Sequence, residues 1–188
     1  MAGRIERKGE GIQAIKKRFK KPGTVDVGII DAGEHTDPEG EGELTVAAIA
    51  FIHEFGAEID HPGGTSYVIG EGGKAQFVKE GTPGIVGVTK PHKIIIPERS
   101  FMRSTLKEKK KEIIALQKKL LVKIRKGELS VNDALGLIGE FTAAAMSQRL
   151  VTLKSPANKP ATIKKKGSSN PLVDTGQTKN SITYEINR

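Results

Sequence analysis

The chain has 188 residues, enough for one ordinary domain, but only 36% are hydrophobic and 4% aromatic. It contains no cysteine, which excludes disulfides and thiolate metal sites, and no apolar run reaches the roughly 20 residues that cross a bilayer. The formal net charge of +9 is compatible with a polyanionic partner. We expect a small aliphatic core, with more apolar surface buried against other copies of the chain.

The first part of the chain predicts two helices and a strand. Apolar residues at helical spacing predict a helix over residues 5–20, and alternating apolar residues predict a strand over 25–29. Residues 31–43 carry six acids and no Lys or Arg, and are expected to form a loop. Residues 45–55 predict a second helix, which Gly56 should end in a left-handed conformation.

The middle of the chain predicts an excursion and a long helix. Residues 61–90 are rich in Gly, Thr and Pro, and predict a loop or hairpin excursion. The sequence KIIIP at 93–97 predicts a strand that Pro97 stops. The helical spacing that follows predicts a long helix ending at Gly127, with Phe101 and Leu106 buried.

The last part predicts one more helix and a strand. Ser130 and Asp133 form a box-like start signal for the helix. We expect residues 152–170 to be a linker or arm and residues 181–186 to be a strand. The helix also contains three consecutive alanines that predict close packing against a neighbouring chain: Ala143, Ala144 and Ala145.

These elements predict one α+β domain over residues 1–188. We expect a small antiparallel or mixed sheet packed with two or three helices, a hairpin excursion at 61–90, and an extended C-terminal arm that includes 152–170. The acidic segment 31–43 and the basic segment 103–126 could dock head to tail in neighbouring copies.

His53 and Glu54 stand side by side and suggest a metalloprotease or an acid–base pair. The zinc-protease pattern needs a second His four positions after the first, but position 57 is Ala. The sequence also has no nucleophile elbow. We therefore expect no metal, no cofactor and no catalysis, with a hydrolase acting through His53 and Glu54 as an alternative.

Lysine clusters at 107–111, 118–119 and 164–166 could contact phosphates. Nucleic-acid sites often interleave aromatic side chains, and these clusters do not. A solvated helix face and an exposed arm explain them better, and a basic nucleic-acid-binding protein is the main alternative function.

Three stretches, in this order, resemble the tail-completion and neck proteins of long-tailed bacteriophages, of the phage virion morphogenesis type. They are AAIAFIHEFGAEI, IIIPERSFMRSTL and KPATIKKKGSSNPLVDTGQTKNSITYEI. Ser100 stands where the family usually has Pro, although Ser can also begin a helix. The matching residues are Glu54, Phe55, Gly56, Ile96, Pro97, Arg99, Phe101, Pro171, Leu172, Asp174, Thr175, Gly176, Ser181, Ile182 and Tyr184.

The resemblance implies a structural virion protein that forms a homo-oligomeric ring at the head–tail junction. It implies six or twelve copies, a lumen through which DNA passes without sequence-specific binding, and contacts with neck, portal-adaptor or tail-tube proteins. The ring would be assembled in the host cytoplasm, end in the neck or tail of the virion, and need no membrane. The resemblance does not distinguish between three positions for the ring: neck adaptor, stopper and tail terminator.

Overall fold

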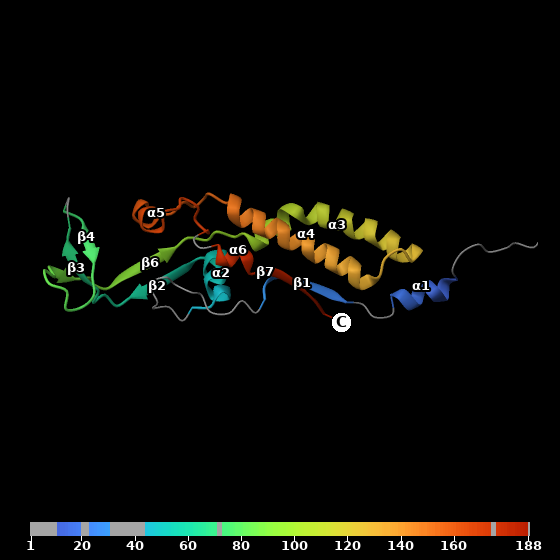
Figure 1. Ribbon diagram of the computed structural model, residues 1–188, viewed down its shortest axis with the longest axis horizontal. Coiled ribbons are helices and arrows are strands. Elements are labelled where there is room, and N and C mark those ends of the chain that lie inside the picture. The colour runs from blue at the N-terminus through green and yellow to red at the C-terminus, as the bar shows by residue number, and fades with distance from the viewer. Residues whose placement is uncertain (1–10, 20–22, 31–43, 71–72, 174–175, 188) are drawn as a thin grey trace, which may run out of the picture.

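The computed structural model describes residues 11–19, 23–30, 44–70, 73–173 and 176–187. The molecule is elongated, with paired helices toward one end and a narrow ribbon that leads to a small sheet at the other (Figure 1). Helices and small antiparallel sheets make up the structure, which confirms the expected α+β class. Of the helices that the structure describes, none is long and apolar enough to cross a membrane.

The body of the molecule is built on helix α4 (Val131–Thr152). It packs against helix α3 (Met102–Lys126) and against an antiparallel pair of strands, β1 (Thr24–Ile29) and β7 (Ile182–Asn187). Gly139 allows the close approach of α4 to the strands, because a Cβ there would lie 2.5 Å from Cγ of Tyr184. Both predicted strands are confirmed, and they come from opposite ends of the chain.

The core of the body has two clusters of buried residues. The larger one surrounds Phe101 and includes Met146 and Leu150, and the smaller one joins Leu120 and Ile124 of α3 to α4. Phe101 is fully buried, as predicted. The burial predicted for Leu106 is wrong, because its side chain is 46% exposed. Neighbouring side chains on a helix point about 100° apart, and the preceding residue of α3 faces the core instead.

Residues 57–96, which we call the arm, project from the body. Strands β2 (Ala57–His61) and β6 (His92–Ile96) form an antiparallel ribbon. At its end lies a three-stranded sheet in the order β4 (Ala75–Phe77), β3 (Ser66–Ile69) and β5 (Gly87–Val88). The expected hairpin excursion is thus a small sheet carried on a ribbon.

Four shorter helices complete the structure: α1 (Ile12–Arg18), α2 (Val46–Phe55), α5 (Pro160–Lys166) and α6 (Gln177–Asn180). The predicted helix 5–20 is described only from residue 11, where it appears as α1. Helix α5 lies within the expected linker 152–170, where Pro at its first position favours the start and Gly167, with φ +69°, ends it. The segment is therefore partly helical rather than an extended arm throughout.

The start signal predicted for α4 is confirmed with one difference. The hydroxyl oxygen of Ser130 accepts a hydrogen bond from the backbone N–H of Asp133 at 3.0 Å, as in a capping box. The carboxylate of Asp133 accepts from the hydroxyl of Ser130 at 2.6 Å, instead of reaching the backbone N–H of Ser130.

Candidate functional site

The carboxylate of Glu54, in the last turn of α2, caps the start of α3. Its Oε2 accepts the backbone N–H groups of Phe101 and Met102 at 2.8 and 2.9 Å. Its Oε1 accepts the N–H of Arg103 at 2.9 Å and the hydroxyl of Ser100 at 2.7 Å. The first N–H groups of a helix have no partner within it and favour negative charge. Glu54 thus supplies from another helix the cap that the N-cap residue of α3, Phe101, does not supply with its own side chain.

The surroundings of Glu54 keep it ionised. Burial alone would raise its pKa, but the hydrogen bonds from Met102, Ser100, Arg103 and Phe101 outweigh burial, and the pKa of Glu54 is held below its ordinary value. The guanidinium of Arg103 also donates from Nε to Oε1 of Glu54 at 3.0 Å. A buried carboxylate is stable only when it is paired and hydrogen-bonded, and Glu54 is both.

Arg103 connects the capping residue Glu54 to residues on the surface of the body. Its Nη2 donates to the backbone oxygen of Glu54 at 2.6 Å and to Oε1 of Glu98 at 2.8 Å. Its guanidinium carbon lies 4.2 Å from the centre of the Phe55 ring, which is a cation–π contact. The Phe55 ring lies 4.7 Å from that of Phe51, so α2 presents an aromatic pair on the surface of the body.

His53 has a different environment from its neighbour. Burial, together with the nearby charges of Arg99 and Lys166, lowers the pKa of His53 to about 4, so it is neutral at neutral pH. Its Nδ1 atom is buried and has no hydrogen-bond partner among the described residues. The carboxylate of Glu54 is engaged with α3, which gives it a structural role. The expectation that the chain is not an enzyme stays a prediction.

Gly56 connects α2 to the arm. Its φ is +75° and its ψ is 168°, so the predicted left-handed conformation is wrong, although the positive φ still favours glycine. The extended ψ takes the chain directly from α2 into β2. A Cβ at this position would lie 3.0 Å from both the backbone N of Glu98 and the backbone O of Ile96, so the close approach of the two chain segments also favours glycine.

Arg99 holds the segment after α4 against the start of α3. Its side chain is nearly fully buried, and Nε donates to the backbone oxygen of Pro156 at 2.7 Å. Nη2 donates to the backbone oxygen of Ala157 at 3.3 Å and to Oδ1 of Asn158 at 3.0 Å. Burial lowers the pKa of Arg99 below its ordinary value. Three neutral acceptors thus replace the water around a buried cation.

Asn170 fixes the same segment at its far end, and sequence reasoning missed it. Its Nδ2 donates to the backbone oxygen of Val151 at 2.6 Å, and its Oδ1 accepts the N–H groups of Leu172 and Val173 at 2.9 and 3.0 Å. An Asn before Pro is a common turn residue whose side chain bonds to the backbone that follows. The Asn170-Pro171 pair was the available signal.

The first two motifs of the resemblance meet at one corner between the arm and the body. Glu54, Gly56, Arg99 and Phe101 come together there, with Phe55 beside them on the surface. Pro97, half-buried, ends β6 just before the corner. In the third motif, Gly176 precedes α6, which packs near α2 and α4. Asp174 and Thr175 lie outside the described residues.

The three alanines predicted as an interface do not share one face of α4. Ala143 packs in the larger core cluster, Ala145 is half-buried, and Ala144 is exposed. Successive residues turn about 100° around a helix, so three neighbours in sequence point in three directions. Ala143 is therefore not available to another chain, and the predicted three-alanine interface is wrong in that respect.

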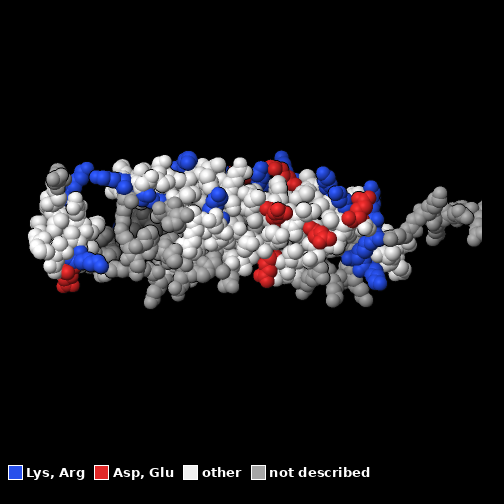
Figure 2. Space-filling view, viewed as in Figure 1, with Lys and Arg blue, Asp and Glu red and all other residues white. Residues whose placement is uncertain are grey.

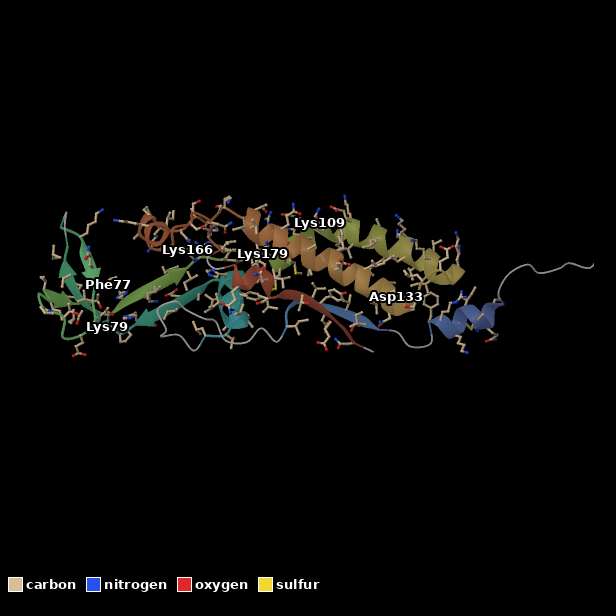
Figure 3. The ribbon with its side chains drawn as sticks, viewed as in Figure 1. Phe77, Lys79, Lys109, Asp133, Lys166 and Lys179 are labelled. Atoms are coloured by element: carbon tan, nitrogen blue, oxygen red, sulfur yellow. The ribbon has the colours of Figure 1, made fainter. Side chains whose placement is uncertain are left out.

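The arm exposes most of its large apolar side chains. Among its described residues only Ser66 is buried. Figure 3 places Phe77, which is 70% exposed, at the tip of the arm, and Asp133 near the opposite end of the molecule. A second apolar surface lies along α3, on Leu106, Ile114 and Leu121. The exposed apolar residues of the arm are Ile59, Ile69, Phe77, Ile85, Val86, Val88, Ile94 and Ile95.

The described residues do not bring three His, Asp or Glu side chains together as ligands for a metal ion.

Comparison with protein-family models, curated proteins and solved structures finds no match to this chain. The resemblance to phage connectors is therefore carried by the three sequence motifs alone.

Proposed function

We propose that the chain is a structural subunit that joins copies of itself into a ring, and that the ring is a neck or tail-completion connector of a tailed bacteriophage. The observation that carries this proposal is the exposed apolar surface of the arm. Small sheets need a covered apolar face for stability in water. The arm has eight exposed large apolar side chains and only one buried residue, a serine, among those described.

Among the described residues, no other part of this chain covers that apolar surface. The segments that the structure leaves undescribed carry few apolar residues, and their sequences are mostly charged or small. This composition supports a second chain as the source of the cover. The apolar residues in those segments are Met1, Ala2, Ile5 and Ala32.

The positions of the exposed surfaces support a ring of identical copies. The arm and the stripe on α3 are different surfaces in different parts of an elongated molecule (Figure 1). A contact between two different surfaces is head-to-tail, and it produces a closed ring when the rotation between copies closes. The resemblance supplies the phage setting, the copy number of six or twelve, the lumen for DNA and the neighbouring neck or tail proteins.

The mass of the purified protein in solution tests the assembly. Light scattering coupled to size exclusion, with native mass spectrometry, should give one multiple of the 20.2 kDa chain, and electron microscopy should show rings. Assembly could require the neighbouring tail or neck protein, so the same measurement is made with tail tubes present. A monomer under both conditions would contradict the proposal.

The phage setting has its own test. Loss of this chain from a phage that encodes it should leave filled heads and tails that fail to join, or tails of abnormal length. The matched control restores the intact chain from a plasmid and should restore joined particles. Normal infectious particles without the chain would show that it has another role.

Nucleic-acid binding is the second candidate, favoured by the net charge of +9 and by the exposed lysines of α3. Acidic side chains also lie over the helical end on the face that Figure 2 shows, and α3 contains no aromatic residue for stacking on bases. A salt titration of DNA binding separates the candidates, because phosphate contacts give a steep loss of affinity with salt. Tight, salt-sensitive binding by a monomer would favour the second candidate.

A further inference from the structure

We propose that one face of the arm ribbon docks on the exposed stripe of α3 in the next copy of the chain. This contact rests on the ring proposed above and defines which surfaces join its subunits. We call the two surfaces the ribbon face (Ala57, Ile59, Ile94 and Ile96) and the α3 stripe (Leu106, Ile114 and Leu121).

The two faces of the ribbon differ in chemistry. Ala57 lies opposite Ile96 and Ile59 opposite Ile94, and paired residues two apart along a strand share a face. That ribbon face is aliphatic up to its two central isoleucines, which are exposed, and it ends at the tip side in the stacked rings of His61 and His92. The other face carries Ile95 beside an ion-pair group in which Lys93 contacts Glu58 and Asp60. Burial of the aliphatic face against another chain removes apolar surface from water, which is favourable.

The α3 stripe is a second apolar side of that helix, separate from the side that packs on α4. Its residues are seven and eight positions apart, about two helical turns each, so they lie on one side of the helix. The stripe spans about 22 Å, for 15 steps of 1.5 Å. Ala57 and Ile59 are two strand steps apart, about 7 Å. The ribbon face therefore covers only part of the stripe, and we place it at Ile114, the central residue of the stripe.

The arm and the α3 stripe of one chain cannot meet each other while the corner is intact. Strand β6 runs into the start of α3, and the arm extends away from the helix (Figure 1). The cap by Glu54 and the buried Arg99 hold that geometry. The occupant of each surface is therefore another chain.

Charge favours an arm as the occupant of the stripe. Residues 103–126 contain ten basic and two acidic residues, a net charge of +8, so two α3 helices face to face would repel. Residues 57–96 contain four acids and four bases, a net charge of zero. A neutral arm can cover the apolar stripe without placing like charges together, and each copy then offers one arm and one stripe.

Cysteine cross-linking tests this contact, because the chain has no cysteine of its own. Two variants with different tags, Ile94→Cys and Ile114→Cys, are co-expressed, purified as the assembly and treated with a short bis-maleimide. We expect a cross-linked dimer that contains both tags, and little product when either variant is expressed alone. Co-expression of Ile95→Cys with Ile114→Cys is the matched control, since Ile95 is more exposed but lies on the opposite face of the ribbon. Its yield should be several-fold lower.

Self-association gives a second readout. Replacing Ile94 or Ile114 with Ser removes one apolar side chain from the contact, and each change should weaken self-association about tenfold or more. Equal yields from Ile94 and Ile95, or a dominant dimer of one variant with itself, would overturn the proposed contact. An intact ring with no mixed cross-link would overturn the contact but not the ring, whereas a monomeric wild-type protein would overturn both.

Discussion

The body and the arm belong to one chain but are stabilised differently. In the body, apolar side chains from α3, α4, β1 and β7 pack around Phe101. In the arm, the described apolar side chains are exposed or half-buried, and backbone pairing between short strands carries the structure. The body therefore has a buried apolar core of its own, whereas the described part of the arm has none and leaves most of its large apolar side chains exposed.

The corner between these regions uses charged residues where the body uses apolar ones. Glu54 and Arg99 are both nearly fully buried, and each satisfies several groups that come from distant parts of the sequence. Burial of charge gives little net stability, but removing one member of such a set is costly. The corner therefore fixes the direction in which the arm leaves the body.

The largest expected effect distinguishes a buried Phe of the body from an exposed Phe of the arm. Phe101→Ala should lower the free energy of unfolding by about 3–5 kcal/mol, because it removes a fully buried ring. Phe77→Ala, at a side chain that is 70% exposed, should change the free energy of unfolding by about 0.5 kcal/mol or less. Urea denaturation of the dilute protein measures both. Similar losses for the two variants would abolish the distinction between body and arm.

The second effect concerns the cap at the corner. Glu54→Gln places an amide N–H₂ group among backbone N–H donors and leaves at least one donor without an acceptor. We therefore expect the free energy of unfolding to fall by about 2–4 kcal/mol at neutral pH. The control is Glu58→Gln on the exposed ribbon, where loss of the pair with Lys93 should cost about 1 kcal/mol or less. Urea denaturation measures both variants.

The pH dependence of the Glu54 variant gives an independent check. The pKa of Glu54 is lowered in the folded protein, so its contribution is present at neutral pH and is lost as the pH falls through the folded-state pKa. The stability difference between the wild type and Glu54→Gln should therefore shrink in acid. A difference that stays constant with pH would mean that the charge of Glu54 does not matter.

His53 provides the third effect, in a separate pH window. The unfolded chain protonates this residue as the pH falls through 6.5, whereas the folded protein keeps it neutral down to about 4. The unfolded state then binds more protons, so stability decreases between pH 6.5 and about 4, by at most about 3 kcal/mol. His53→Gln should show a smaller decrease over this window in denaturation measured at several pH values. Identical slopes would show that His53 is not the group responsible.

Local patterns in the sequence predicted most of the elements of the body. Helical spacing located α3 and α4, and alternation located β1 and β7, because one face of each element meets the core. The same spacing could not tell which of two apolar sides of α3 meets α4, so Leu106 was assigned to the wrong side. Consecutive alanines were read as one surface although they point in different directions around α4.

The corner could be predicted only in part. The motifs singled out Glu54, Arg99 and Phe101, but the contact between Glu54 and the start of α3 joins residues 47 apart in sequence. No local pattern encodes such a contact, since it depends on how α2 and α3 cross in space. The clamp of Arg99 on Pro156 has the same origin, and its partners lie in a segment that the sequence identified only as a linker or arm.

The smallest expected effect is in the arm, and it depends on protein concentration. Val86→Ser changes a side chain that is 63% exposed, so the dilute subunit should lose about 0.5 kcal/mol or less. If another copy covers this surface, the loss should increase at concentrations where the protein assembles, because association stabilises the folded state by mass action. Leu150→Ala is the control, since a fully buried leucine should cost about 2–5 kcal/mol at every concentration. Thermal unfolding at low and high concentration measures both variants, and a Val86→Ser effect that is small and constant at both would place this part of the arm outside any contact between copies.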